Sequence, residues 1–446
     1  MAFRSALSRA FPLAALLAAT VAIPASAQRD TVPQAGVRLR LTYEPQYEPG
    51  FVVLPFGGDA GAAEAVRGIV RQDLDFSDRF ELKEPSGARA GDEVNVALWR
   101  ERGADWVLQG SVEGRGGALA LRLTLHDAVY GQVKGSGTFD LPAQNSRGFR
   151  MAVHAASDAV VRWATGEPGM AASRIAFVTQ GRGSKEIYLV DSDGENVTRV
   201  TSDGSIALSP AWSPDGRKLA YTSYRSGAPF LYERDLGTGA DRLVSDRTGL
   251  NITPAYAPDG RTIAFATTVS GGTEIATTGA GGLRQHTQGR RHISLSPTFS
   301  PDGGRIAFVS DRLGEPQIYV MELGGQPRLI SEYTYGSRGY STSPDWSPTG
   351  PQIAYHTRVG GAHQIVVSAA DGGRARLLTD RGRNEDPSWA PDGRHLVFAS
   401  PDRDGGGLFV LDTVSGRVRP LVRGRGFGLP DWSPTLARAT GAAGGR

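Results

Sequence analysis

The stretch Pro210-Ala-Trp-Ser-Pro-Asp-Gly-Arg-Lys-Leu-Ala-Tyr221 decides the fold, because close copies of it return through the second half of the chain. The copies are spaced 44, 43, 47, 43 and 43 residues apart and begin at Pro254, Pro297, Pro344, Pro387 and Pro430. This period is typical of a four-stranded propeller blade and exceeds that of a helical hairpin repeat. Six copies therefore predict six blades.

Each copy is interpreted as an inner strand, a tight turn and a second strand. Pro-Asp-Gly supplies the turn, with Pro at its first corner and a Gly that is free to take a positive φ. Alternating apolar residues, such as Leu219 and Tyr221, then indicate a half-buried strand. A third strand follows in most copies, for example 317–321, and a short fourth one, for example 328–330. The predicted unit is a four-stranded meander.

The two ends of the repeat region complement each other. Segments 174–178, 187–191 and 198–201 supply second to fourth strands with no inner strand before them, and 431–434 is an inner strand with no outer strands after it. Pairing of the two fragments closes the ring and removes two sheet edges that would otherwise promote aggregation. We therefore expect an all-β six-bladed propeller of WD40-like repeats, closed by its N- and C-terminal strands.

The composition is ordinary for a soluble globular protein, and 446 residues suffice for two domains. The chain has no cysteine, which excludes disulfides, thiolate metal sites, cysteine nucleophiles and a lipid anchor on cysteine. Without residues 1–27, Lys and Arg fall from 49 to 47 against 46 Asp and Glu. This near balance gives no argument for nucleic acid as a partner.

Residues 1–27 have the pattern of a secretory signal peptide: basic Arg4 and Arg9, an apolar run over 11–23, and Ala25-Ser-Ala27 as a cleavage site. The run is shorter than the roughly 20 residues of a membrane span, so a retained anchor is the weaker alternative. The other expected parts are a flexible tail over 28–36, an α/β domain over 37–165, a linker over 166–173, the propeller over 174–435 and a flexible tail over 436–446.

Within the α/β domain, hydrophobic periodicity predicts three helices, over 60–74, 94–102 and 146–165. The predicted strands are 37–41, 50–56, 79–82, 105–109, 119–126 and 131–139, the last two forming a hairpin.

Signatures of catalysis are missing from the sequence. It contains no HExxH, no GxxxxGK[ST] and no GxSxG, and Gly57-Gly58 is interpreted as a turn because the GxGxxG spacing is lacking. The repeated aspartates Asp215, Asp259, Asp302 and Asp392 are assigned to turns, since one per blade is too far apart for a metal site or a carboxylate pair. Inter-blade packing is expected of Trp212, Trp346, Trp389 and Trp432. We predict no catalytic residue, metal or cofactor.

The candidate binding site is one mouth of the central channel. The segments that lead into the inner strands surround this mouth and differ among the blades, while the strands repeat; a scaffold that presents a binding surface shows this contrast. Plain solvated loops are the alternative. We predict partner binding by Asn251, Ile252, Ser294, Leu295, Tyr340, Ser341, Asn384 and Phe427.

Four further segments stand out beside the repeat: Gly50-Phe-Val-Val-Leu-Pro-Phe56, Gly103-Ala-Asp-Trp-Val107, Arg174-Ile-Ala-Phe-Val178 and Ser310-Asp-Arg312 with Pro316-Gln-Ile-Tyr319. Through these segments almost the whole chain after residue 27 resembles the periplasmic TolB proteins of the Tol-Pal system. The WSPDG repeat alone is less specific, because tricorn-like and prolyl-peptidase propellers share it. The α/β domain in front of the repeats makes the resemblance much more specific.

The resemblance implies a monomeric, non-enzymatic protein of the periplasm whose propeller mouth binds the peptidoglycan-associated lipoprotein Pal. It implies a role in envelope integrity and outer-membrane constriction at division, with membrane association only through partners. It also implies that the mature N-terminus engages TolA of the inner membrane, here through Gln28, Arg29, Val32 and Val37. Two features depart from the family pattern: nine residues precede the first strand, and Thr replaces Asp in Pro348-Thr-Gly350.

Two alternatives from other classes remain. One is a peptidase regulated by its propeller, which needs a hydrolase domain of a few hundred residues, whereas only 435–446 follow the last strand. The other is a propeller that binds a sugar or another small ligand by itself.

Overall fold

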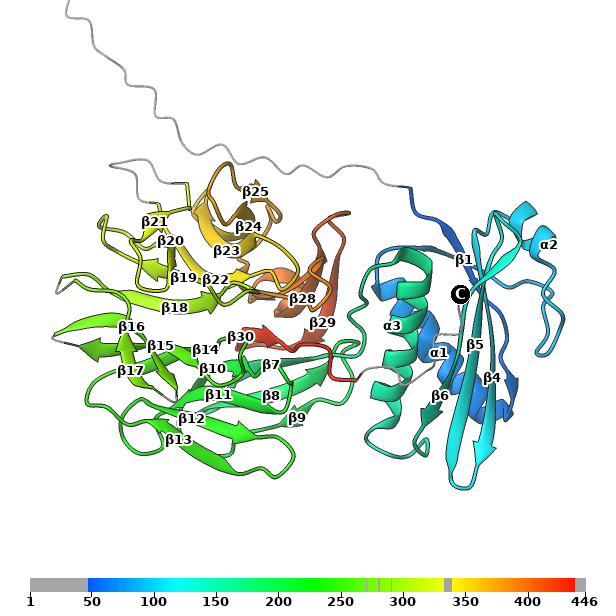
Figure 1. Ribbon diagram of the computed structural model, residues 1–446, viewed down its shortest axis with the longest axis horizontal. Helices are drawn as coiled ribbons and strands as arrows, with labels where there is room; N and C mark the ends of the chain where they lie inside the picture. Colours follow the sequence, from blue (N-terminus) through cyan, green and yellow to red (C-terminus); the bar gives the residue numbers. More distant parts are fainter. Residues whose placement is uncertain (1–46, 270, 280, 290, 333–338, 438–446) are drawn as a thin grey trace, which may run out of the picture. The chain divides into compact units, whose positions relative to one another are not determined.

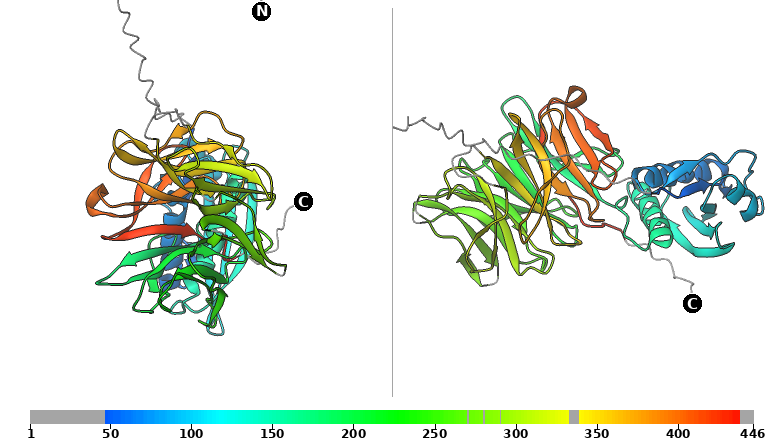
Figure 2. Two further views of the ribbon diagram at one scale, coloured as in Figure 1. Left: turned by 90° about the vertical axis from the view of Figure 1, so that its left-hand side faces the viewer. Right: turned by 90° about the horizontal axis from the view of Figure 1, so that it is seen from above.

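In the residues that the structure describes, the repeats fold into six four-stranded antiparallel sheets, and in five of these sheets the four strands follow one another along the chain. The computed structural model describes residues 47–269, 271–279, 281–289, 291–332 and 339–437. The expected signal peptide, the tail over 28–36, the strand over 37–41 and most of the C-terminal tail lie outside these residues. Figure 1 labels most of the strands of these sheets, and Figure 2 shows the protein from two further sides.

The first three sheets of the repeat region are, from inner to outer strand, β10(Ala207–Trp212) to β11(Lys218–Ser223), β12(Phe230–Asp235) and β13(Asp241–Ser245); β14(Asn251–Tyr256) to β15(Ile263–Val269), β16(Gly272–Gly279) and β17(Gly282–Gln285); and β18(Ser294–Phe299) to β19(Arg305–Ser310), β20(Gln317–Glu322) and β21(Arg328–Leu329).

The next two are β22(Ser341–Trp346) to β23(Gln352–Val359), β24(Ala362–Ala369) and β25(Arg376–Leu377), and β26(Glu385–Trp389) to β27(His395–Ser400), β28(Gly407–Asp412) and β29(Val418–Arg423), with the short 3-10 helix η1(Arg403–Gly405) before β28. The sixth sheet joins β30(Phe427–Trp432) to β7(Arg174–Gln180), β8(Lys185–Asp191) and β9(Thr198–Arg199).

The ring is closed by the two ends of the repeat region, as the sequence predicts. β30 pairs antiparallel with β7, with Phe427 opposite Thr179 and Trp432 opposite Ile175. Neighbouring inner strands contact each other in the order β10, β14, β18, β22, β26, β30 and back to β10. In Figure 1, β30 lies beside β7 although their sequence positions differ by some 250 residues.

Every inner strand contains the same bulge, which the sequence analysis did not predict. The residue before the repeat proline has a positive φ in all six copies: Ser209, Thr253, Ser296, Ser343, Asp386 and Leu429, at 49 to 53°. The pairing register shifts at this point, for example between Leu208 and Ala211. Proline has no N–H to donate to a ladder, so a bulge that leaves it unpaired allows the strand to continue.

The core between the blades is aromatic and aliphatic. Trp212, Trp346, Trp389 and Trp432 are buried, and so is Phe299 at the equivalent position, which agrees with their expected packing role. Small residues and large rings alternate on the second strands, as in Ala264 and Phe265 of β15.

The α/β domain has a sheet ordered β3(Glu81–Lys83), β1(Gly50–Val53), β4(Trp106–Arg115), β5(Ala118–Asp127) and β6(Gln132–Leu141), with β2(Gly57–Gly58) on β4. Its helices are α1(Ala60–Phe76), α2(Val96–Glu101) and α3(Phe149–Thr165). The buried faces of α1 and α3 pack on the sheet around Phe51, Leu108 and Leu121. The right-hand view of Figure 2 shows these two helices on one side of the long strands.

Capping residues set the bounds of the long helices. Asp59 caps α1 by accepting a bond of 3.0 Å from the N–H of Ala62, and Gly166 ends α3 in the left-handed conformation. Gly57-Gly58 differs from the predicted turn, because it pairs in parallel with Ser111 and Val112 of β4. At Gly58 a Cβ would lie 1.9 Å from the carbonyl oxygen of Val112, so only glycine permits this close pairing.

Candidate functional site

The inner strands of all six blades line a central channel. One cavity of about 280 Å³ is bounded by the bulge residues and repeat prolines, among them Ser209, Thr253 and Leu429. A second cavity of about 480 Å³ lies toward the rings of Trp212, Trp346 and Trp389 and the prolines of the Pro-Asp-Gly turns. The predicted mouth residues sit at the opposite end of the inner strands from these turns.

Four of the eight predicted mouth residues are buried: Asn251, Ser294, Ser341 and Asn384. Asn251 accepts a bond from the Ser245 hydroxyl at 2.8 Å and donates to the carbonyl of Arg247 at 2.7 Å. Asn384 donates to the side-chain oxygen of Gln364 and to the carbonyl of Arg381, both at 2.9 Å. These hydrogen bonds hold the segments of the rim in place and leave the two amides facing the interior of the protein.

The other four predicted residues, Ile252, Leu295, Tyr340 and Phe427, are half-buried. The ring of Tyr340 stacks on His363, with centroids 5.4 Å apart and planes 8° apart. Phe427 packs edge-on against Phe177 at 5.2 Å. Most of the predicted segments are not loops, because residues such as Asn251 and Phe427 begin the inner strands themselves. Because of the bulge, the same inner strand pairs with the second strand of its blade and also contributes residues to the rim of the mouth.

The mouth beside Tyr340 contains a histidine cluster that the sequence analysis missed. The rings of His356 and His363 lie 4.9 Å apart, and Nδ1 of His363 is 2.8 Å from a carboxylate oxygen of Glu385. Burial lowers the pKa of His356, against the opposing effect of Asp386. No motif spacing marks this cluster in the sequence, since its members come from β23, β24 and β26.

Two half-buried carboxylates, Asp345 and Asp431, lie in the channel wall. Asp345 accepts a bond from the N–H of Trp389, and Asp431 from the N–H of Trp212, each at 2.7 Å and each from the neighbouring blade. Burial raises the pKa of Asp345 to about 6, and burial together with the charge of Asp345 raises the pKa of Asp431 well above its usual range. These bonds tie adjacent inner strands together.

The turn aspartates act largely as the sequence predicts. Asp215, Asp259 and Asp302 accept bonds from N–H groups two residues later, at 3.0, 2.8 and 3.0 Å. Asp392 makes the same turn contact and has a second role, because its other oxygen lies 2.7 Å from Nδ1 of His395.

Two clusters bring His and Asp atoms within 4.8 Å of one another: Asp78, His395 and Asp412, and His154, Asp191 and Asp193. Arginines already pair with these carboxylates, including Arg417 with Asp78, Arg394 with Asp412 and Arg150 with Asp193. A guanidinium on each carboxylate identifies the clusters as ion-pair networks.

The proposed N-terminal partner segment, Gln28, Arg29, Val32 and Val37, lies outside the described residues. Among the residues that are described, every helix is too short or too polar to cross a membrane.

Comparison with known proteins finds two matching families. The family described as "TolB beta propeller domain" matches residues 161–436, and the one described as "TolB amino-terminal domain" matches residues 39–133. The chain is 34% identical over 202 residues to the Tol-Pal system protein TolB of Polaromonas naphthalenivorans, covering 45% of this chain and 46% of that protein. It is 36% identical over 235 residues to the same-named protein of Anaeromyxobacter dehalogenans, covering 50% and 52%.

These matches span about half the length of the curated relatives. A likeness of wider extent comes from a crystal structure of TolB from Acinetobacter baumannii. That structure superposes with a TM-score of 0.77 at 27% identity, covering 90% of this chain and all of that one.

Proposed function

The chain belongs to the TolB family, and from this premise we propose that it is a non-enzymatic interaction scaffold of the Tol-Pal system. Its partner in this proposal is a peptidoglycan-associated lipoprotein of the Pal type, bound at the propeller mouth. Through this partner the protein would support envelope integrity and constriction of the outer membrane at division. The proposed location is the periplasm, reached by means of the signal peptide over 1–27.

The observation that carries the proposal is the contrast between a repeated scaffold and a varied rim. The bulge recurs in every blade and an aromatic ring fills the same slot in each, a buried tryptophan in four of them, whereas the half-buried rim side chains change from Ile252 and Leu295 to Tyr340 and Phe427. A partner segment that reaches the channel entrance would meet apolar anchors on several blades at once. A few central anchors of this kind dominate the affinity of most protein interfaces.

The rim also combines apolar and charged groups. Tyr340 stacks on His363, whose Nδ1 faces Glu385, and Arg383 lies 4.0 Å from the same carboxylate. Aromatic groups next to polar ones are typical of the centre and edge of an interface. A second, separate proposal assigns the segment with Gln28, Arg29, Val32 and Val37 to a TolA-like protein of the inner membrane.

A pull-down from detergent-solubilised envelopes tests the proposal. The tagged full chain should retain a lipoprotein of the Pal type, and Tyr340→Ala should retain much less of it. Asp302→Asn is the matched control, because Asp302 lies in a turn at the other end of the inner strands and should leave capture unchanged. Capture of no envelope protein, together with peptidase activity that one point mutation abolishes, would contradict the scaffold.

A further inference from the structure

Two fully buried histidines lie where the α/β domain meets the propeller. His154 of α3 places Nδ1 2.9 Å from both carboxylate oxygens of Asp73 in its own domain. Its Nε2 lies 3.4 Å from Asp193, which belongs to the turn after β8 of the propeller. Arg150, four residues before His154 on α3, pairs with the same carboxylate of Asp193. The propeller thus inserts one aspartate between two cationic side chains of a helix.

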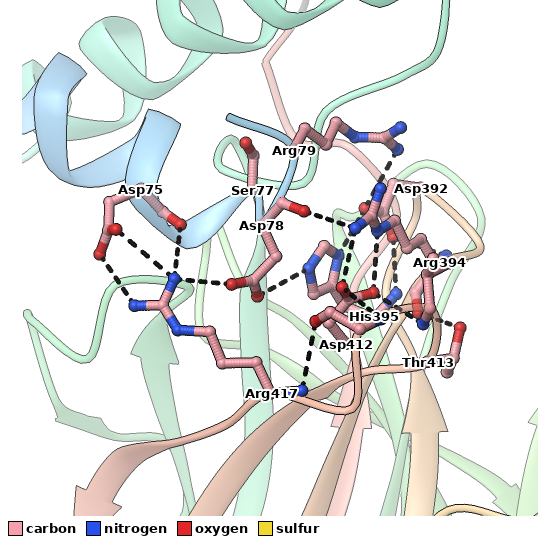
Figure 3. A network of polar contacts seen from close by, with 12 residues as sticks. Asp75, Ser77, Asp78, Arg79, Asp392, Arg394, His395, Asp412, Thr413 and Arg417 are labelled. Atoms are coloured by element: carbon pink, nitrogen blue, oxygen red, sulfur yellow. Dashed lines mark hydrogen bonds and ion pairs between the residues drawn. The ribbon is translucent and has the colours of Figure 1, made fainter. Parts of the chain in front are cut away.

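The second histidine has the reverse arrangement (Figure 3). His395 of β27 places Nδ1 2.7 Å from Asp392 in its own domain and Nε2 3.3 Å from Asp78, which follows α1. Arg417 of the propeller pairs with Asp78 at 2.9 Å, and Arg394 donates to the carbonyl of Asp78. Here the α/β domain inserts the aspartate, and the propeller supplies the histidine and the arginines.

The two contacts are therefore reciprocal. Each domain contributes a histidine held by a carboxylate of the same domain, and each inserts one aspartate beside the histidine and an arginine of the other. Asp78 and Asp193 have side chains only 3% and 1% exposed. A buried carboxylate is stable only with its cations in place, so loss of either histidine charge acts directly on the contact between the domains.

Backbone strain at Asp78 supports this reading. Asp78 has a φ of +51° just after the last turn of α1, where glycine is the usual residue. A non-glycine residue in this conformation costs free energy, and such outliers gather at positions with a function. The side chain of Asp78 makes no bond that holds the turn itself among those described; its bonds run to His395 and Arg417.

We propose that His154 and His395 form a proton-dependent latch that holds the α/β domain on the propeller while both imidazoles are charged. The latch consists of two separate contacts, one at His154 and one at His395, and each contact depends on one bound proton.

The charged groups around each histidine determine its pKa and therefore the pH at which it loses its proton. Burial opposes the charge of His154, but Asp73 and Asp193 raise its pKa to about 10. Burial also opposes the charge of His395, and Asp392, Asp78 and Asp412 raise its pKa above the ordinary value of 6.5. Other charged groups that face these sites are Arg150, Asp158 and Asp191 at His154, and Arg79, Arg394, Arg417 and Asp75 at His395. The buried Arg419 of β29 faces both bridging aspartates, Asp78 and Asp193.

The direction of the pH effect follows from these raised pKa values. A histidine whose pKa is raised by docking stabilises the docked state fully below the pKa that it has in the undocked domain, and this contribution is lost as the pH rises toward the docked pKa. For His154 this window ends at a pH of about 10 and begins above 6.5, because Asp73 of the same domain raises the pKa even without docking. The docking equilibrium should fall by at most about tenfold per pH unit for each proton released.

Asp158 responds in a different window. It accepts bonds of 2.9 Å from the N–H groups of Ala171 and Ala172 in the linker, and burial raises its pKa to about 7. The folded chain therefore favours the protonated form of Asp158. The contribution of this form to stability is complete below the ordinary pKa of 3.8 and is lost as the pH rises to about 7. Asp158→Asn removes this response and leaves the histidine window in place.

The test is a distance measurement in the full chain. Because the sequence has no cysteine, Lys134→Cys in the α/β domain and Arg261→Cys in the propeller give two unique, exposed sites for spin labels. Double electron–electron resonance should show one narrow distance at pH 6 and a growing longer population between pH 6.5 and 10. A distance distribution that stays constant over this range, with native circular dichroism, would overturn the proposal.

Variants distinguish an effect on the docking of the two domains from an effect on overall stability. His395→Gln and His154→Gln should show the longer population already at pH 6 and a flattened pH response. His126→Gln is the matched control, since burial alone shifts the pKa of His126, and it should behave as the unmodified chain does.

If either glutamine variant fails to fold, the variant Asp78→Gly still tests the proposal. It removes the bridging carboxylate while relieving the strain at positive φ, so the domain should stay folded and the longer population should grow at every pH. Asp78→Gly with unchanged distances and unchanged pH response would overturn the proposal.

Discussion

One residue of the repeat, the aspartate of the Pro-Asp-Gly turn, shows how local chemistry stabilises each blade. The hydroxyl of Ser213 and the N–H of Arg217 lower the pKa of Asp215, and the Ser300 hydroxyl with the N–H of Gly304 lowers the pKa of Asp302. At Asp259 the N–H groups of Thr262 and Arg261 do the same. The charged form of each turn aspartate is thus the form that the folded chain prefers.

Acid should therefore weaken the propeller through these turns. Their pKa values are depressed on folding, so their contribution is complete above the ordinary value of 3.8 and is lost as the pH falls below it. The triple variant Asp215→Asn, Asp259→Asn, Asp302→Asn should lose less melting temperature between pH 5 and 2.5 than the unmodified chain. Asp380→Asn, at an exposed site, is the control. Parallel melting curves for the triple variant and the unmodified chain would contradict this account.

Trp432 is the residue on which closure depends most. Its ring is buried beside Ile175, and its indole N–H donates to the Ser173 hydroxyl at 2.7 Å, joining the end of the repeat region to its beginning. Trp432→Ala should lower the free energy of unfolding by about 3 to 5 kcal/mol. Trp432→Phe keeps most of the packing and should cost only about 1 kcal/mol for the lost hydrogen bond. Chemical denaturation measures both, and equal losses would contradict the packing argument.

At the scale of elements, β30 replaces an inner strand that the first part of the propeller lacks. Without β30, the backbone groups of β7 on that side have no partner, and an open strand edge promotes aggregation. A chain truncated before Gly428 should be insoluble or loosely folded. The control ends at Ala437 and keeps all of β30. A truncated chain with an unchanged melting temperature would show that closure is dispensable.

The sequence predicts most elements because their signals are local. The repeat period and the Pro-Asp-Gly turns give the blades, and the missing inner strand before Arg174 gives the closure, later seen as the pairing of Trp432 with Ile175. The helix over 60–74 is observed as α1, which ends two residues later, and the apolar spacing that predicts it forms the buried face of the helix.

Features that depend on distant contacts were not predicted. The bulge at Ser209 and its five equivalents arises from pairing with a second strand, and sequence alone shows only the proline after it. The turn predicted at Gly57-Gly58 is wrong because Gly58 pairs closely with Val112 of β4, a contact between residues far apart in the sequence. Burial of Asn251 and Asn384 could not be read from their polar character. The bridge from Asp78 to His395 joins residues 317 apart in the chain.

At the scale of the whole molecule, the two ends of the inner strands have different tasks. Asp392 and Arg394, which contact the α/β domain through Arg79 and Asp78, lie in and after a Pro-Asp-Gly turn. The mouth residues lie at the opposite ends of the strands, where the α/β domain makes no described hydrogen bond or ion pair with them. The propeller can thus contact the α/β domain at the turn end of its inner strands while the mouth end stays available to a partner.

The central claim is that a partner binds at this mouth, and calorimetric titration with a purified Pal-type protein lacking its lipid tests it most directly. Tyr340→Ala and Phe427→Ala should each weaken binding by about 2 kcal/mol, roughly thirtyfold, while Asp302→Asn binds normally. Because Phe427 also packs on Phe177, the melting temperature of each variant is measured alongside. If Asp302→Asn weakened binding while both mouth variants bound as tightly as the unmodified chain, the partner would lie at the turn end of the channel and the account would be wrong.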